Sequence, residues 1–325
     1  MKYIRLNNGI EMPQLGLGTF LVPSDMLSQT IKAAYDLGYR QFDTAWKYRN
    51  ENDIASALKE HGIPRENVFL TTKFNACALH YGKYKYGRRS IFNIRNFKTI
   101  KGVIQESFDN LGTDYIDLFL IHYPFPKSHK IWYALSELYK EGHIKAIGVS
   151  NFLQPHLAAL KDFSDIVPAV NQFEISPLNT QKQLIRYCQQ HGIAVQAMST
   201  FSHFRSVEPR KEIFESPILI EIAKHHRRSV AQIVLRWLQQ QDIIMIPKTW
   251  NIEHLRENIS IFDFELNDEE MSAIDSMDGG HFLNYEPHGQ QQGFVKRHRD
   301  WEGFIEWNKD NKLPIGKILK RRLGL

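Results

Sequence analysis

Short strand-like segments and longer helix-like segments alternate along the whole chain, and this alternation predicts an α/β protein. The strand-like runs lack the regular polar and apolar alternation of half-exposed strands, which indicates a parallel sheet covered on both faces. About eight strand–helix units fit into the chain, and no linker-like stretch divides it. We therefore expect a (β/α)8 barrel, the TIM-barrel architecture, as a single domain over residues 1–325.

The expected elements begin with a β-hairpin over residues 3–12 that turns at Asn8-Gly9 and covers the lower end of the barrel. Seven strands of the barrel are expected at 41–43, 68–73, 116–122, 144–149, 169–172, 194–198 and 243–246. Helical spacing of apolar residues follows several of them, at 50–58, 131–141, from 154 onward and at 180–190.

Two regions depart from this rhythm. No acidic residue occurs between Glu66 and Glu106, and tyrosines alternate there with lysine and arginine. We expect a long inserted loop at about residues 76–98. A basic, aromatic run also fits a segment that binds nucleic acid, but a loop folded over a pocket is the interpretation we adopt, so no nucleic-acid partner is expected. The extended C-terminal tail, residues 279–325, is rich in aromatic side chains and is expected to pack over one face of the barrel.

The composition is that of an ordinary globular protein, with 42% hydrophobic and 24% charged residues and a formal net charge of +5. No run of about 18 apolar residues predicts a membrane span, and residues 1–7 contain no apolar signal core. The two cysteines, Cys77 and Cys188, match no disulfide or metal-site spacing. These features predict a cytoplasmic protein that binds no membrane or metal. We expect a monomer or weak oligomer whose partner is a small molecule.

Four polar side chains follow three of the expected strands. Asp43 closes one strand, Lys73 closes the next, and His122 closes a third. Tyr48 lies just beyond Asp43. Taken singly, Asp43 and Lys73 could form a structural ion pair, and His122 could be a core histidine. Chemistry in this architecture, however, occurs at the carboxyl ends of the strands. The group of four therefore predicts a catalytic site.

The four residue types suit the reduction of a carbonyl group. Hydride delivery to a carbonyl carbon leaves an alkoxide, which requires a proton in the same event. A phenol has an ordinary pKa of about 10, too high for an efficient acid near neutral pH. An ammonium about 4 Å away contributes about 4 kcal/mol at an effective dielectric constant of 20, so we expect Lys73 to lower the pKa of Tyr48 by about 3. Asp43 would hold Lys73 charged, and His122 would donate to the carbonyl oxygen.

Several ordered motifs carry a family resemblance. They are MPQLGLGT at 12–19, GYRQFDTAWKYRNE at 38–51, DYIDLFLIHYP at 114–124, IGVSNF at 147–152, VNQ at 170–172 and IPK at 246–248. With these segments the chain resembles the aldo-keto reductase superfamily over nearly its whole length.

The resemblance implies an NAD(P)H-dependent reductase whose catalytic tetrad is Asp43, Tyr48, Lys73 and His122. It also implies that Ser150, Asn151 and Gln172 hold the nicotinamide carboxamide, a group that needs both donors and acceptors. Further cofactor-binding positions that the resemblance assigns are Gly18, Thr19, Asp43, Met198, Ser199, Lys248, Thr249, His254, Glu257 and Asn258.

The chain departs from the family pattern in three places. His254 stands where an arginine commonly binds the adenosine 2′-phosphate, and a histidine is less charged and lacks the bidentate fork. We therefore expect NADPH as the cofactor, with a weakened preference over NADH. Met198 stands where an aromatic ring usually stacks on the nicotinamide, unless Phe201 reaches over instead. The insert after Lys73 is longer than usual.

The residues expected at the mouth of the site, by the same resemblance, are Phe20, Trp46, Lys47, Tyr48, His122, Tyr123 and Phe201. Lys47 is the unusual member. It is either a solvated charge at the rim or, together with the basic insert, a recognition element for an anionic carbonyl substrate.

Two other functions fit parts of this pattern. A Schiff-base aldolase would use Lys73 as its nucleophile, but it leaves Tyr48 and the carboxamide set unexplained. A non-catalytic, NADPH-sensing subunit on the same fold is the second alternative, since a fold does not determine a function.

Overall fold

The computed structural model describes residues 1–75, 97–124, 128–202 and 209–280. The expected insert at 76–98 lies outside the described residues, except that α4 (Phe97–Leu111) includes its last two positions. The expected tail at 279–325 also lies outside them, apart from Gly279 and Gly280.

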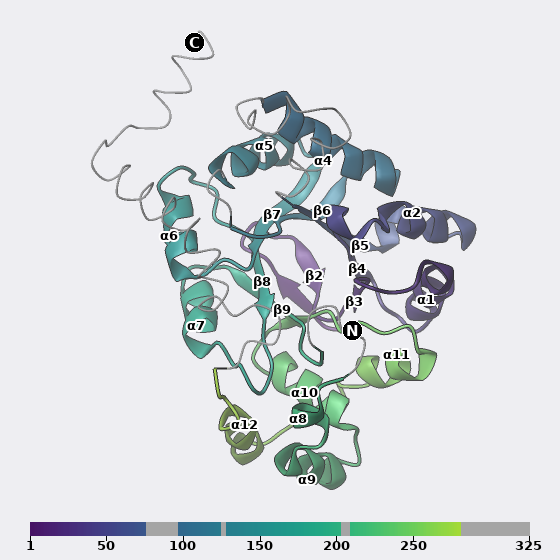
Figure 1. The fold of residues 1–325 in the computed structure, drawn as a ribbon, viewed down its shortest axis with the longest axis vertical. Coiled ribbons are helices and arrows are strands. Elements are labelled where there is room, and N and C mark those ends of the chain that lie inside the picture. The colour runs from purple at the N-terminus through teal and green to yellow at the C-terminus, as the bar shows by residue number, and fades with distance from the viewer. Residues whose placement is uncertain (76–96, 125–127, 203–208, 281–325) are drawn as a thin grey trace.

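An eight-stranded parallel sheet forms the centre of the molecule, in the order β10-β9-β8-β7-β6-β5-β4-β3. In chain order its strands are β3 (Leu17–Gly18), β4 (Gln41–Asp43), β5 (Phe69–Phe74), β6 (Ile116–Ile121), β7 (Ile144–Ser150), β8 (Val170–Glu174), β9 (Ala194–Met198) and β10 (Ile244–Met245). A parallel bridge between Leu15 and Met245 joins the two edges, and the Gly16 N–H donates to the Met245 carbonyl at 2.8 Å. The sheet is thereby closed, which confirms the predicted (β/α)8 barrel (Figure 1).

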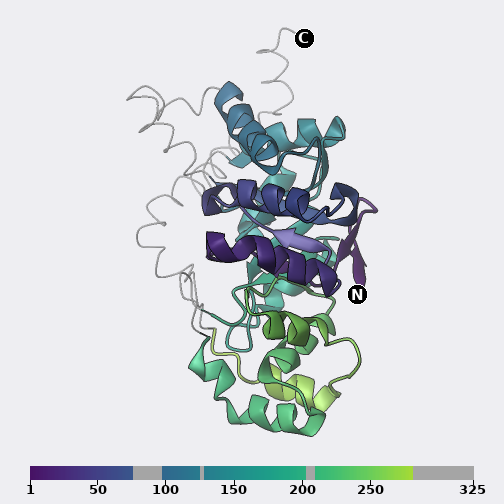
Figure 2. The ribbon, with the colours of Figure 1, turned by 90° about the vertical axis from the view of Figure 1, so that its right-hand side faces the viewer.

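Helices surround the strands on the outside of the barrel (Figure 1). Besides α4 they are α1 (Ser24–Asp36), α2 (Glu51–Glu60), α5 (Ser128–Lys140), α6 (Gln154–Lys161), α7 (Lys182–Gln190), α8 (Lys211–Phe214), α9 (Pro217–His226), α10 (Val230–Gln239), α11 (Ile252–Ile259) and α12 (Asp268–Asp275). Figure 2 shows α1 and α2 side by side on this outer layer, where they contact each other.

The predicted N-terminal hairpin is present and covers one end of the barrel. Strands β1 (Tyr3–Arg5) and β2 (Glu11–Pro13) pair antiparallel, and Gly9 takes the turn with a φ of 88°. Leu6 and Met12 are buried in a cluster with inward side chains of the strands, among them Leu118. The hairpin therefore closes the end of the barrel opposite the carboxyl ends of the strands.

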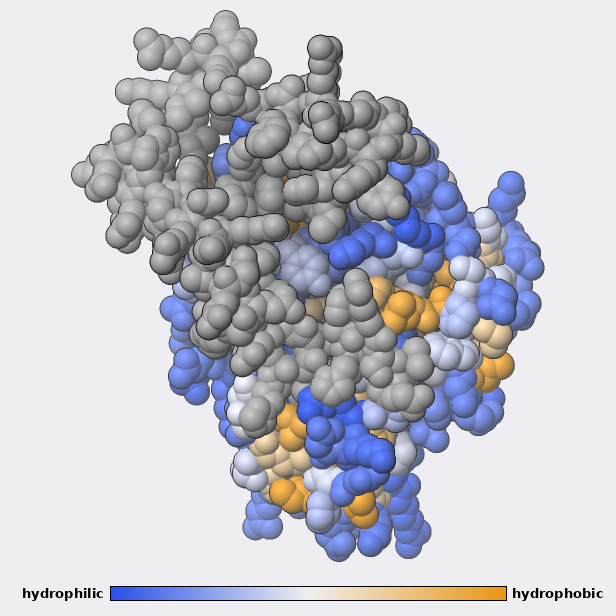
Figure 3. Space-filling view, viewed as in Figure 1, coloured by the Kyte–Doolittle hydropathy of each residue, from blue (hydrophilic) through white to orange (hydrophobic). Residues whose placement is uncertain are grey.

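The surface visible in Figure 3 is mostly hydrophilic where residues are described, with hydrophobic side chains in small groups. Within the described ranges, no helix combines the length and the apolar character that crossing a membrane would require.

Candidate functional site

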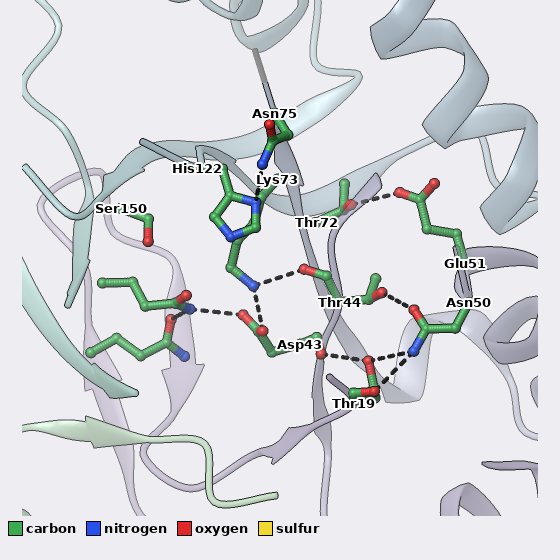
Figure 4. Close-up of polar contacts among 12 residues, drawn as sticks. Thr19, Asp43, Thr44, Asn50, Glu51, Thr72, Lys73, Asn75, His122 and Ser150 are labelled. Carbon is green, nitrogen blue, oxygen red and sulfur yellow. Dashed lines mark hydrogen bonds and ion pairs between the residues drawn. The ribbon is translucent and has the colours of Figure 1, made fainter. Parts of the chain in front are cut away.

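Three neighbouring strands bring the first site residues together. Asp43 is the last residue of β4, Lys73 lies near the end of β5, and His122 directly follows β6. These strands pair in sequence, with Asp43 opposite Thr71 and Lys73 opposite Leu120. The parallel register places all three side chains at the carboxyl ends of the strands (Figure 4).

A buried ion pair forms the centre of the site. The Lys73 side chain is 0% exposed, and its ammonium donates to the Asp43 carboxylate and to the Thr44 carbonyl at 2.8 Å. The second Asp43 oxygen accepts from the Gln172 side-chain amide at 2.8 Å. Burial raises the pKa of Asp43 and lowers the pKa of Lys73, while the attraction between the two charges opposes both changes.

Tyr48 completes the predicted group of four. It ends the 3₁₀ turn η1 (Trp46–Tyr48), after which Arg49 takes a left-handed conformation with a φ of 62°. The Lys73 ammonium lies 5.1 Å from the centre of the Tyr48 ring. The rings of Tyr48 and His122 lie edge to face with centres 5.7 Å apart. The structure therefore brings all four residues together.

The expected lowering of the pKa of Tyr48 is wrong for the protein alone. Burial, then the charge of Asp43 and then Tyr123 raise the pKa of Tyr48 well above its ordinary value. The expectation counted the ammonium of Lys73 but not the carboxylate that pairs with it. Loss of solvent on burial is the largest cause, and the carboxylate of Asp43 acts in the same direction.

His122 is held in one tautomer by a residue that sequence analysis missed. The Asn75 side-chain nitrogen lies 3.3 Å from His122 Nδ1 (Figure 4). An amide nitrogen can only donate, so Nδ1 accepts and the ring hydrogen resides on Nε2. Burial, Lys73 and Lys47 lower the pKa of His122 well below its ordinary value, so the ring is neutral. Asn75 directly follows β5, so its place at the carboxyl end of a strand could have identified it as a site residue together with Lys73.

A buried hydrogen-bond network supports the ends of these strands. The Thr19 hydroxyl donates to the Asp43 carbonyl at 2.9 Å, and Asn50 Nδ2 donates to the Thr19 carbonyl at 3.0 Å. The Thr44 hydroxyl donates to Asn50 Oδ1 at 2.6 Å (Figure 4). Thr19, one of the residues predicted to touch cofactor, is fully buried and contacts the backbone of Asp43.

The three residues predicted to hold a carboxamide lie together at the ends of β7 and β8. Ser150 and Gln172 are paired in register, and Asn151 follows with a φ of 61°. The Gln172 amide nitrogen donates to Asp43 and, at 2.7 Å, to Gln196, which leaves its carbonyl oxygen as an acceptor. The Ser150 oxygen accepts from Asn151 at 3.1 Å and retains a hydroxyl hydrogen to donate. One donor beside one acceptor fits the two ends of a carboxamide.

The residues predicted for the adenosine end follow β10. A Cβ built on Gly18 would lie 3.8 Å from Lys248 Cβ, so this loop borders the end of β3. Lys248 is half-buried, and burial lowers the pKa of its ammonium. Thr249 is buried before α11. On α11 itself His254 is exposed, Glu257 is half-buried and Asn258 is buried.

At the end of β9, Met198 is half-buried and Ser199 takes a left-handed conformation with a φ of 56°. Phe201 packs on Phe214 of α8, with ring centres 5.6 Å apart.

The expected mouth residues divide into two groups. Phe20 packs on Tyr48 at 4.6 Å between ring centres, and Tyr123 stacks on His122 at 4.7 Å. Lys47 is exposed, and its charge contributes to the low pKa of His122. Trp46 is buried, and its indole N–H donates to Glu106 of α4 at 3.1 Å.

Comparison with known proteins agrees with this geometry. The model of the aldo/keto reductase family matches residues 14–278. Glyoxal reductase of Bacillus subtilis (strain 168) is 38% identical over 277 residues, which cover 84% of this chain and 92% of that protein.

Solved structures show the same relationship. An aldo-keto reductase from a Medee basin deep-sea metagenome library has a TM-score of 0.76 at 35% identity, covering 87% of this chain and 97% of that one. A Bombyx mori aldo-keto reductase in complex with NADP has a TM-score of 0.75 at 31% identity, covering 89% and 96%. The chain therefore belongs to the aldo/keto reductase family of oxidoreductases.

Proposed function

We propose that this protein reduces an aldehyde or ketone to an alcohol with NADPH as the reductant, and that Tyr48 supplies the proton. The observation that carries the proposal is the position of Tyr48, with the Lys73 ammonium 5.1 Å from its ring centre and the His122 ring 5.7 Å away. An acid, a buried ion pair and a neutral imidazole at one point are the parts that this reaction requires.

Each group has a separate task in this proposal. A raised pKa keeps the Tyr48 phenol protonated, so the proton is present when the substrate arrives. Neutral His122 carries its hydrogen on Nε2, from which it donates to the carbonyl oxygen and sets the approach of the substrate. The Lys73 ammonium stabilises the phenolate that remains after transfer, because it lies beside the Tyr48 ring.

The polar groups around this point fit a nicotinamide dinucleotide. Ser150, Asn151 and Gln172 would hold its carboxamide, and Lys248 would attract its phosphate through a half-buried ammonium. When bound, the nicotinamide supplies the hydride. A bound NADP in the Bombyx mori relative supports the choice of cofactor.

Complete burial of Lys73 counts against the Schiff-base alternative. Its side chain is 0% exposed and its ammonium is engaged with Asp43 and Thr44. A nucleophilic amine requires access to the substrate carbonyl.

We further propose that Lys47 favours carbonyl substrates with an anionic group. Its exposed ammonium stands close enough to His122 to depress the pKa of that ring, so it lies within electrostatic range of the reacting carbonyl. The relative named glyoxal reductase supports small carbonyl compounds as the general class.

A kinetic comparison tests both parts. With NADPH, we expect turnover of simple aldehydes and of carboxylate-bearing ones such as a small keto acid. Lys47→Met should raise KM for the acidic substrates about fivefold or more, the effect of one lost ion pair of about 1 kcal/mol, and leave neutral aldehydes unchanged.

Lys59→Met, which removes an exposed charge on α2, is the matched control. If Lys47→Met changed KM equally for neutral and acidic aldehydes, the proposed role of Lys47 would be refuted, but the proposed reaction would not. Absence of NADPH oxidation with every carbonyl compound would refute the proposed reaction.

A further inference from the structure

Three potential metal ligands converge outside the catalytic site, where α9 ends and α12 begins. His225 and His226 are the last residues of α9, and Glu270 lies in the first turn of α12. His225 Nδ1 lies 2.8 Å from one Glu270 oxygen, and His226 Nε2 lies 2.9 Å from both. One ligand atom from each residue lies within 4.8 Å of the others.

The carboxylate and one imidazole are fixed by further contacts. A Glu270 oxygen accepts from the Asn267 N–H at 2.9 Å, as part of the capping box of α12. The His226 ring packs on Phe264 with centres 5.4 Å apart. His225 is 67% exposed on its side chain, so the group is open to solvent on that side.

The surroundings also favour a cation. The carbonyl end of α9 carries the negative end of the helix dipole beside both histidines. The Glu270 carboxylate is oriented by the Asn267 N–H, which donates to it at 2.9 Å. The nearby Arg228 is paired with Asp263 at 2.7 Å.

We infer that His225, His226 and Glu270 form a binding site for one divalent zinc ion. Two imidazoles and a carboxylate are ligands that zinc prefers, at about 2.0–2.2 Å, with water in the fourth tetrahedral position. The nitrogens of both histidines already lie within 2.9 Å of Glu270 oxygens, and the exposed His225 ring leaves room for the adjustment that zinc requires.

Such an ion would act on stability and not on the reaction. In Figure 1, α9 and α12 lie at the lower edge of the molecule, outside the ring of strands. A bound ion would join two helices that are 44 residues apart at His226 and Glu270. It would thereby stabilise the folded state by mass action.

Zinc titration of the full chain, treated with chelator and dialysed, tests this inference by calorimetry and thermal unfolding. Glu270→Gln keeps the capping box but removes the anionic ligand, and His225→Ala changes an exposed side chain. Asp268→Asn, which removes a neighbouring charge of the same turn, is the matched control.

The wild-type chain should bind one more zinc ion than Glu270→Gln, and His225→Ala should weaken that site at least about tenfold. Zinc should raise the Tm of the wild type and Asp268→Asn by more than that of the other two variants. Equal zinc binding and equal Tm rises in all four proteins would overturn the inference, as would the absence of saturable binding to the wild type. Equal Tm values in chelator would show that the variants fold.

Discussion

At the scale of single residues, the buried pair of Lys73 and Asp43 decides how the phenol of Tyr48 behaves. In the protein without cofactor or substrate, burial and the charge of the Asp43 carboxylate raise the pKa of the Tyr48 phenol. The Lys73 ammonium is paired with that carboxylate. The ammonium nevertheless lies beside the Tyr48 ring, with its nitrogen 5.1 Å from the ring centre. The pair therefore matters more for the transition state than for the resting acid.

Asn75 gives a prediction about pH dependence. The pKa of His122 is well below its ordinary value of about 6.5, so the ring is neutral above that pH and protonates only in more acid solution. Asn75→Asp replaces the donor to Nδ1 with a carboxylate of similar shape. The carboxylate should place the hydrogen on Nδ1, raise the pKa of His122 and lower kcat about tenfold, as expected for one hydrogen bond of about 1.4 kcal/mol.

The measurement is kcat against pH for both proteins. Wild-type activity should show no loss that is due to His122 down to about pH 6.5, whereas the variant should lose activity at a higher pH. Identical profiles would mean that Asn75 does not position His122. Asn67→Asp, at an exposed amide remote from His122, is the control.

His254 gives a prediction about cofactor choice. An exposed imidazole on α11 should bind a 2′-phosphate weakly, so wild-type kcat/KM should be similar for NADPH and NADH. His254→Arg should raise the ratio of the two values about tenfold or more through a charged hydrogen bond of about 1.5–3 kcal/mol. His143→Arg, at another exposed histidine, should leave the ratio unchanged. A wild type that is already strictly selective for NADPH would contradict this account.

At the scale of elements, the N-terminal hairpin contributes to stability at the end of the barrel away from the reaction. Met12 of β2 is fully buried against inward side chains of the strands. Met12→Ala should reduce the free energy of unfolding by about 2–5 kcal/mol, the usual result of such a cavity, and leave kcat unchanged. Urea unfolding measures the loss, with Tyr3→Ala, at a 50% exposed position, as control. A large fall in kcat would place the hairpin in communication with the site.

The sequence predicts the elements well where apolar runs are long. Strand β9 has the predicted bounds, as does β4, and β5, β6 and β7 differ by a residue or two. Strand β3, only Leu17–Gly18, was not predicted, because two residues carry no periodicity. Its place in the barrel depends on hydrogen bonds to residues after β10, a contact between distant parts of the chain.

The candidate site was predictable in composition but not in its electrostatics. Asp43, Lys73 and His122 were located because each ends a strand, and the closed sheet brings those ends together. The direction in which the pKa of Tyr48 changes was not predictable, because it depends on how completely the groups around the phenol are buried. The proximity of Glu270 to His226 could not be predicted from the sequence either, because it arises only from the packing of α9 on α12.

At the scale of the whole molecule, closure of the barrel makes one site from segments far apart in the chain. Asp43 of β4 is bonded to Lys73 of β5 and to Gln172 of β8. This hydrogen-bonded group thus joins Lys73, which lies beside the ring of the proposed proton donor, to the proposed carboxamide site. The proton donor and the bound cofactor can act on one substrate only if these segments are held together, and no single strand or helix contains them all.

Single-turnover oxidation of bound NADPH by a simple aldehyde tests the central claim most directly, with Tyr48→Phe compared against the wild type. The wild type should oxidise the cofactor rapidly, and the variant should bind it equally well but react at least about 100-fold more slowly, as expected when a general acid is removed. Tyr35→Phe, at a half-buried tyrosine on α1, should behave as the wild type. Hydride transfer at an undiminished rate in Tyr48→Phe would contradict the assignment of Tyr48 as the proton donor.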